Sequence, residues 1–266
     1  MDREKKICLI GAGNMGGALA RGIVRGGYAS AEEICLTARS ESTLAPFRDE
    51  GFRTTTDNRQ AVRNAGMVMI AVKPAAVPSV LEEIRDSLDF GNQIVVCIAA
   101  GIKPETFDRI LGKRNGKAAE LVYLIPNTPI ETGRGVNFIA PVHASEQTVE
   151  KVCKALENTG RTIITDLDML GAGMALASCG TAYAMKYIGT IAAIGAKMGF
   201  DSAEALEIAY DTVGGAAALL QYRKSSPSEE IRRVATPGGY TERGLKAMDK
   251  EGFTAALEAA HEKLEE

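Results

Sequence analysis

The stretch Ile7-Cys8-Leu9-Ile10-Gly11-Ala12-Gly13-Asn14-Met15-Gly16 determines the fold class expected for this chain. Four apolar residues, typical of a buried strand, lead directly into a G-x-G-x-x-G motif, and a helical pattern then runs to about Gly26. In this order the first glycine permits a tight turn, the second lets a pyrophosphate approach the backbone, and the third lets the helix pack on the strand. The residues expected to bind a dinucleotide here are Gly11, Gly13, Asn14, Met15 and Gly16. A glycine-rich turn without a ligand is the alternative.

Further apolar runs follow at residues 34–37, 67–72, 94–98 and 121–125, with helical patterns between them. Each run is continuously apolar instead of alternating, as expected when helices cover both faces of a parallel sheet. This alternation predicts an α/β fold whose N-terminal domain, residues 1–165, is a Rossmann-type doubly wound parallel sheet. Two shorter runs, residues 136–139 and 161–164, are expected to add edge strands.

The character of the sequence changes at about residue 166. Strand-like runs stop there, and a long helical pattern rich in Ala, Met, Leu and Gly continues to about residue 213. Polar or glycine-rich breaks at residues 225–228 and 236–239 separate the later helical segments. Residues 166–266 are therefore expected to form an all-α C-terminal domain.

Composition excludes several classes of function. The net charge of −3 and the absence of a polybasic run argue against a nucleic-acid partner. Two histidines and five cysteines without C-x-x-C spacing predict no metal site, and scattered cysteines indicate reduced thiols in a cytoplasmic protein. The uncharged residues 169–185 have the length of a membrane span, but their Gly, Ala and Ser favour a helix buried by other helices, so no membrane partner is expected.

The second apolar run indicates which dinucleotide binds. NAD-binding chains usually place Asp or Glu at its end, whereas this run ends in Thr37-Ala38-Arg39-Ser40. Hydroxyl groups and a guanidinium suit a 2′-phosphate, so Thr37, Arg39 and Ser40 favour NADPH, with NADH as a weaker cofactor. Asn58 is placed near the adenosine end from its position alone. The alternative is that Arg39 is a solvated loop charge.

A second glycine-rich turn, Thr236-Pro237-Gly238-Gly239-Tyr240-Thr241, precedes a helical run. Two glycines at a helix start expose consecutive backbone N–H groups, which predicts a small anion site suited to a substrate carboxylate. An ordinary helix cap, with Thr241 as the capping residue, is the alternative.

Five segments together resemble the successive motifs of the pyrroline-5-carboxylate reductases. They are residues 11–16, 71–74 (Ala-Val-Lys-Pro), 98–102, 125–129 and 236–245, in the order typical of that family, and they span most of the chain. The last motif is the most specific, because the first is shared by many dehydrogenases.

The resemblance implies a role for each matching residue. The loops expected to line the nicotinamide are Ala71, Val72, Lys73 and Pro74, together with Ala99, Ala100 and Gly101. The substrate-binding residues are Thr236, Gly238, Gly239, Tyr240 and Thr241, with backbone N–H groups of residues 238–240 on the substrate carboxylate. Thr241 is the implied catalytic residue, because its hydroxyl would lie close to the imine nitrogen. The family also implies self-association through the C-terminal helical domain, with the dimer as the building block.

The expected reaction is reduction of Δ1-pyrroline-5-carboxylate, a small imine acid, to L-proline by hydride transfer from NADPH to the C=N carbon. One departure from the family is visible: its common Ser-Gly-Ser-Gly-Pro-Ala-Tyr stretch corresponds here to residues 177–183, of which Gly180, Ala182 and Tyr183 are kept. This departure concerns the shape of the substrate pocket and the size of the ring that it accepts, so a six-membered imine acid is an alternative substrate. The alternatives are a β-hydroxyacid dehydrogenase-like enzyme and a non-catalytic NADPH-binding regulator.

Overall fold

The computed structural model describes residues 6–114 and 116–262. The chain divides into two compact units, Met1–Thr181 and Ala182–Glu266. The change from strands to helices comes after residue 164, and the helical segment from residue 167 to residue 181 belongs to the first unit. The boundary between compact units therefore lies later in the chain than the change in sequence character.

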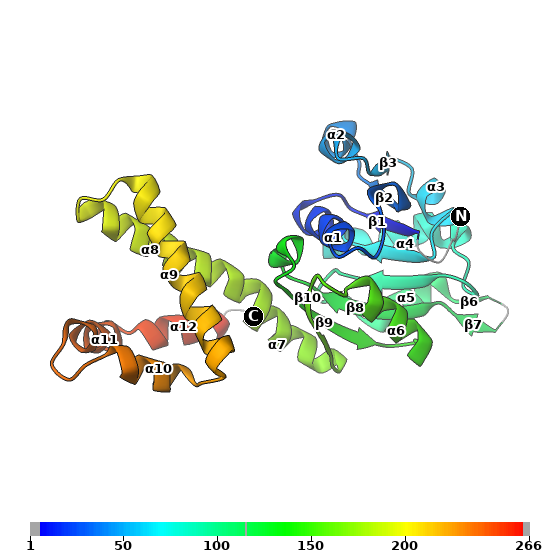
Figure 1. Cartoon of the computed structure of the whole chain (residues 1–266). Helices are drawn as coiled ribbons and strands as arrows, with labels where there is room; N and C mark the ends of the chain where they lie inside the picture. The colour runs from blue at the N-terminus through cyan, green and yellow to red at the C-terminus, as the bar shows by residue number, and fades with distance from the viewer. Residues whose placement is uncertain (1–5, 115, 263–266) are drawn as a thin grey trace. The chain divides into compact units, whose positions relative to one another are not determined.

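The first unit is built on an eight-stranded sheet in the order β10-β9-β8-β5-β4-β1-β2-β3 (Figure 1). The strands are β1 (Ile7–Ile10), β2 (Ile34–Thr37), β3 (Arg53–Thr55), β4 (Met67–Ile70), β5 (Ile94–Cys97), β8 (Glu120–Ile125), β9 (Gly135–Pro141) and β10 (Gly160–Ile164). The strand order reverses at β1, which pairs in parallel with both β2 and β4. A doubly wound sheet binds its ligands at such a reversal, at the carboxyl ends of the strands.

Helices cover both faces of this sheet, as the continuously apolar strands predict. One buried cluster joins Ile7 and Leu9 of β1 to α1 (Asn14–Arg25), α2 (Glu41–Asp49) and α6 (Glu146–Ala155). The other joins Cys8 and Ile10 to α3 (Asn58–Arg63), α4 (Val77–Ile84) and α5 (Pro104–Leu111). Alternate residues of one strand thus enter opposite cores, and the predicted Rossmann-type fold is confirmed.

Strand β9 departs from the expected arrangement. It pairs antiparallel with β8 and parallel with β10, so β9 and β10 run against the other six strands. The prediction that residues 136–139 form an edge strand is wrong, because β10 pairs on the outer side of β9 and is itself the edge. Strand β3 and a small antiparallel pair, β6 (Lys113–Arg114) with β7 (Lys117–Ala118), are additional elements.

Between β10 and the second unit the chain is helical. Helix α7 (Leu170–Gly173) continues into a π-helix, Met174–Cys179, and then into α8 (Gly180–Lys197). The second unit contains the rest of α8, α9 (Ser202–Arg223), α10 (Pro227–Val234), α11 (Tyr240–Lys250) and α12 (Phe253–Glu262), all visible in Figure 1. Among the described residues, no helix combines the length and the apolar character needed to cross a membrane.

Candidate active site

The three glycines of the first turn have different surroundings. Gly11 has a φ of +109°, and a Cβ built on it would lie 2.8 Å from the Ala71 carbonyl oxygen. A Cβ on Gly16 would lie 2.0 Å from the Gly11 oxygen, which explains why helix α1 can pack so closely on β1. A Cβ on Gly13 would meet nothing within 4 Å. The exposed face of the turn is therefore at Gly13, where the sequence places the pyrophosphate.

Backbone hydrogen bonds join this turn to the ends of the neighbouring strands. The N–H groups of Gly11 and Ala12 donate to the Thr37 carbonyl at 3.0 and 2.8 Å, and the Ala71 N–H donates to Ile10 at 2.8 Å. The loops after β1, β2 and β4 consequently meet at one edge of the sheet, at the point where the strand order reverses. This edge has the geometry of a dinucleotide site.

Two residues predicted at the adenosine end are engaged with each other. The Thr37 hydroxyl donates to Asn58 Oδ1 at 2.6 Å, and Asn58 Nδ2 donates to Glu83 Oε2 at 2.8 Å. Thr37 is only 1% exposed. The structure therefore gives both side chains a role in holding β2 against α3 and α4, and leaves the Thr37 hydroxyl little access to a ligand.

The next two residues of the loop are exposed. The Arg39 guanidinium makes no hydrogen bond or ion pair with any residue in 6–114 or 116–262. Ser40 precedes α2, and its hydroxyl lies 2.9 Å from Thr43 Oγ1 and 3.2 Å from Ser42 Oγ. A free guanidinium beside three hydroxyl groups at a helix start can bind a phosphate.

The loops expected to line the nicotinamide follow β4 and β5. Lys73 and Pro74 are exposed, and Pro74 opens a short 3₁₀ turn that leads into α4. Ala99 is buried, whereas Gly101 is exposed with a φ of +75°. Because β4 and β5 pair in parallel, both loops lie at the same edge as the Gly11–Gly16 turn.

The second glycine-rich turn lies in the second unit, where Gly239 caps α11. The Gly238 N–H donates to Glu242 Oε2 at 2.7 Å, and the Gly239 N–H donates to the Thr236 carbonyl at 2.9 Å. The Gly238 N–H and Lys246 lower the pKa of the Glu242 carboxyl. A carboxylate of the chain itself thus lies on the turn that the sequence assigns to a substrate carboxylate.

Tyr240 and Thr241 are exposed at the start of α11, with Tyr240 89% exposed. The Arg243 guanidinium stacks over the Tyr240 ring at 4.8 Å from its centroid. The Thr241 hydroxyl has no hydrogen-bond partner within the described part of the chain, and it is available to a ligand.

Asn127 lies in the segment 125–129, and no role for it follows from the sequence. Asn127 follows β8, is 5% exposed and donates to the Ala177 carbonyl in the π-helix and to Thr181 Oγ1 in the first turn of α8. A π-helix inside an α-helical run often marks a functional site. No local sequence pattern predicts a π-helix. The feature of the sequence that points to this site is a polar residue in a Pro-Asn-Thr-Pro loop directly after an apolar strand.

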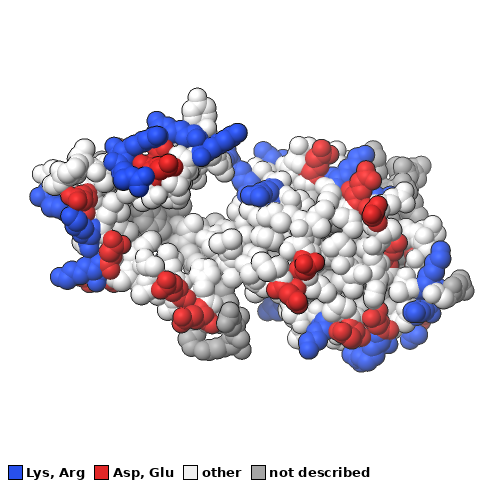
Figure 2. Space-filling view, turned by 90° about the horizontal axis from the view of Figure 1, so that it is seen from below, with Lys and Arg blue, Asp and Glu red and all other residues white. Residues whose placement is uncertain are grey.

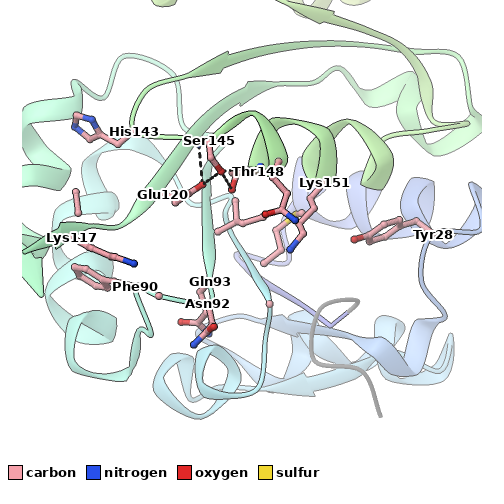
Figure 3. A pocket seen from close by; sticks show the side chains of 16 residues that line it. Tyr28, Phe90, Asn92, Gln93, Lys117, Glu120, His143, Ser145, Thr148 and Lys151 are labelled. Carbon is pink, nitrogen blue, oxygen red and sulfur yellow. Dashed lines mark hydrogen bonds between the residues drawn. The ribbon is translucent and has the colours of Figure 1, made fainter. Parts of the chain in front are cut away.

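A cavity of about 760 Å³ lies at the opposite edge of the sheet, where β4, β5 and β8 begin (Figure 3). Among its polar groups, Glu120 accepts from the Ser145 N–H and hydroxyl at 3.2 and 3.1 Å. His143 lies 3.1 Å from Asp108. This cavity is separate from the cofactor edge.

The described residues contain no group of three His, Cys, Asp or Glu side chains placed to hold a metal ion. Burial raises the pKa of the Cys97 thiol to about 12 and that of Cys8 well above its usual value. These protonated, enclosed thiols are unsuited to nucleophilic chemistry.

On the face shown in Figure 2, Lys and Arg lie beside Asp and Glu on both units.

Comparisons with known proteins cover both units. The pyrroline-5-carboxylate reductase dimerisation family model matches residues 168–266, and the model of NADP oxidoreductase, coenzyme F420-dependent, matches residues 6–101. Pyrroline-5-carboxylate reductase 2 of Dictyostelium discoideum is 32% identical, over 97% of this chain and 90% of that protein. The chain belongs to the pyrroline-5-carboxylate reductase family. The resemblance on which the sequence interpretation rests is thereby confirmed.

Solved structures of pyrroline-5-carboxylate reductases have the same fold. The Coxiella burnetii protein superposes with a TM-score of 0.81 at 28% identity, over 99% of this chain and 98% of that one. A Plasmodium falciparum pyrroline carboxylate reductase with NADP bound gives 0.87 at 21% identity, over 99% and 97%. At that identity the second likeness concerns the fold alone.

Proposed function

We propose that the protein reduces Δ1-pyrroline-5-carboxylate to L-proline with NADPH. The observation that carries the proposal is membership of the reductase family along the whole chain, through both the nucleotide-binding and the helical unit. A β-hydroxyacid dehydrogenase does not account for the match of residues 168–266 to the reductase dimerisation family. The turnover experiment described below distinguishes the reductase from a non-catalytic NADPH-binding regulator.

The residues at the cofactor edge fit NADPH. Gly13 leaves the turn open to a pyrophosphate, and the first turn of α1 presents its N–H groups there. Arg39 and the hydroxyl of Ser40 are the groups proposed to bind the 2′-phosphate, with NADH bound more weakly because it lacks that group. When bound, the nicotinamide supplies the hydride, and the chain's own part is to bind and orient the reactants.

On the substrate side, we assign the carboxylate to the turn at Gly238, Gly239 and Tyr240. A substrate carboxylate would replace Glu242 as acceptor of the Gly238 N–H and would also approach the free N–H groups of the first turn of α11. The Thr241 hydroxyl then hydrogen-bonds the imine nitrogen. A protonated imine is already electrophilic, so this hydroxyl orients it and no strong acid is required.

Self-association and location complete the proposal. Residues 168–266 match a dimerisation family, and the helices of the second unit expose many large apolar side chains, so we propose a homodimer formed through this unit. Five free cysteines fit a reducing, cytoplasmic location.

The first test is NADPH oxidation, followed by absorbance, with Δ1-pyrroline-5-carboxylate as substrate. The six-membered homologue and NADH run in parallel as substrate and cofactor controls. Turnover that is fastest with NADPH and the five-membered ring is the expected result. NADPH binding without reduction of either imine would instead indicate the regulator, and turnover of a hydroxyacid alone would indicate the dehydrogenase.

A further inference from the structure

The side chain of Asn127 makes three hydrogen bonds, which join three segments of the first unit. Its Oδ1 accepts from the Val136 N–H at 2.8 Å, which fixes the start of β9. Its Nδ2 donates to the Ala177 carbonyl at 3.3 Å and to Thr181 Oγ1 at 3.2 Å. A buried amide that both donates and accepts hydrogen bonds in this way holds its neighbours in one arrangement.

The partner segment is the π-helix and the residues after it. Thr181 Oγ1 also donates to the Ala177 carbonyl at 2.7 Å, so one hydroxyl both closes a helical turn and accepts from Asn127. The Ser178 hydroxyl donates to the Pro126 carbonyl at 3.0 Å. Ala177, Ser178 and Thr181, three positions at which the sequence departs from the family pattern, therefore join the helical segment to the β8–β9 loop by hydrogen bonds.

This attachment lies at the proposed reaction edge. Strand β8 pairs in parallel with β5, so the loop that holds Asn127 leaves the sheet beside the loop at residues 99–101. Met174, the first residue of the π-helix, packs on the same core cluster as Val72 and Ala100 of the two proposed nicotinamide loops. A shift of the π-helix would thus be transmitted to the walls of the site.

We propose that Asn127 and Thr181 are positioning residues for the reduction. Their side chains, here called the Asn127–Thr181 clamp, hold the π-helix in register with the loops at the carboxyl edge of β4 and β5. The inference rests on the proposed function for its catalytic consequence, while the clamp itself rests on the hydrogen bonds. Small displacements of a reactant cost large factors in rate, so loosening the clamp lowers kcat more than it weakens NADPH binding.

The test compares Thr181→Val, which removes the hydroxyl and keeps the branched shape, with Thr181→Ser, which restores the hydroxyl. Thr190→Val is the matched control, because the Thr190 hydroxyl makes the same bond to the carbonyl four residues earlier and no bond to Asn127. For Thr181→Val we expect kcat to fall about tenfold, with the NADPH Kd within about twofold of the unsubstituted protein. Thr181→Ser recovers most of the rate, and Thr190→Val keeps it.

An unchanged kcat in Thr181→Val overturns the proposal. A parallel loss of kcat, NADPH affinity and melting temperature also overturns it, because it shows a general structural role. Amide hydrogen exchange of residues 174–181 provides a readout that does not depend on turnover: it should accelerate in Thr181→Val and not in Thr190→Val. If the unsubstituted protein reduces no imine, the proposed function fails, and the exchange result alone decides for or against the clamp.

Discussion

Gly13 and Gly16 lie three residues apart in one turn, yet a methyl group on each would meet different surroundings. At Gly16 it would lie 2.0 Å from the Gly11 oxygen and 2.7 Å from Leu9 Cδ2, so the backbone of β1 or α1 has to move. At Gly13 it would project into open space, where the cofactor is proposed to bind. The same Gly→Ala substitution therefore tests the packing of α1 on β1 at Gly16 and the binding of the cofactor at Gly13.

We expect Gly16→Ala to cost about 1–3 kcal/mol of stability and to lower the melting temperature by several degrees, as overpacking does. Gly13→Ala should melt like the unsubstituted protein and bind NADPH at least about tenfold more weakly, a loss of about 1.4 kcal/mol. Thermal melts and NADPH titrations of both variants provide the check. Equal NADPH affinity in Gly13→Ala would contradict the placement of the pyrophosphate.

Arg39 and Thr37, both predicted from sequence as 2′-phosphate contacts, differ in the structure. Arg39 is exposed and has no partner among the described residues, whereas the buried Thr37 hydroxyl donates to Asn58. Arg39→Gln should raise the NADPH Kd about tenfold and leave the NADH Kd nearly unchanged, because only NADPH carries the 2′-phosphate. Thr37→Val should lower stability without altering the ratio of the two affinities. A changed ratio of the NADPH and NADH affinities in Thr37→Val would show instead that the Thr37 hydroxyl contacts the cofactor.

Thr241 is the residue proposed to contact the imine nitrogen, and its hydroxyl has no partner within the described residues. Thr241→Ala should therefore lower kcat by about tenfold or more, within the range given by losing one positioned hydrogen-bonding group, and leave NADPH affinity unchanged. Thr241→Ser is the control that keeps the hydroxyl. Equal losses of kcat and NADPH affinity in Thr241→Ala would remove this assignment.

At the level of an element, the start of α11 holds a carboxylate of its own. The Gly238 N–H and Lys246 lower the pKa of the Glu242 carboxyl. The stabilisation that these two contacts give the folded protein is therefore present at pH values above the ordinary carboxyl pKa, and it is lost as the pH falls through the lowered pKa of Glu242. Between pH 6 and 9, taken as roughly the working range, Glu242 stays ionised and competes with the substrate carboxylate for the Gly238 N–H. Glu242→Gln should then lower the KM for the imine acid several-fold with little change in kcat. A raised KM in steady-state assays would show that Glu242 assists binding instead.

Sequence patterns located the continuously apolar strands and also β9 and β10, and missed β3 and the β6–β7 pair. The runs at β1, β2, β4, β5 and β8 are visible because both faces of each strand are buried. Strand β3 is Arg-Thr-Thr at a sheet edge and gives no such signal. The direction of β9 depends on its pairing with β8, which no local sequence pattern predicts. The π-helix at Met174–Cys179 likewise has no local sequence pattern.

The candidate site was predictable to the extent that it is built from backbone. Glycine spacing gave the positions of both turns, including the open face at Gly13. The alternative that Thr241 caps the second helix is wrong, because α11 begins one residue earlier than Thr241 and Gly239 is its N-cap. Side-chain pairing was not predictable: Thr37 binds Asn58, and Glu242 binds the Gly238 N–H, through partners that the fold brings together. These pairings decide which of the predicted side chains are available to a ligand.

Across the whole molecule, the two units differ in how much of their own surface they bury. The first has a core on each face of its sheet. Within the described part of the second, residues 182–262, only Ala205, Ala209 and Glu230 are buried, and apolar side chains of α8 and α9 are widely exposed. A unit of this kind needs a partner surface to complete its core.

Ile194 of α8 is 46% exposed and represents this surface. Ile194→Glu should reduce the mass measured by light scattering towards that of a monomer, because a charge cannot be buried unpaired at an apolar interface. Lys197→Gln changes the net charge by the same amount on the same helix and should leave the mass unchanged. A dimeric Ile194→Glu would place the interface elsewhere.

The central position of β1 has a consequence for synthesis of the chain on the ribosome. Its neighbours are β2, ending at Thr37, and β4, ending at Ile70, so the second edge of β1 stays unpaired until some sixty further residues have been made. At roughly 5–20 residues per second that interval lasts about 3–12 s. During it, the first apolar strand of the protein has an open edge, the kind of surface that chaperones bind and that nascent chains aggregate through.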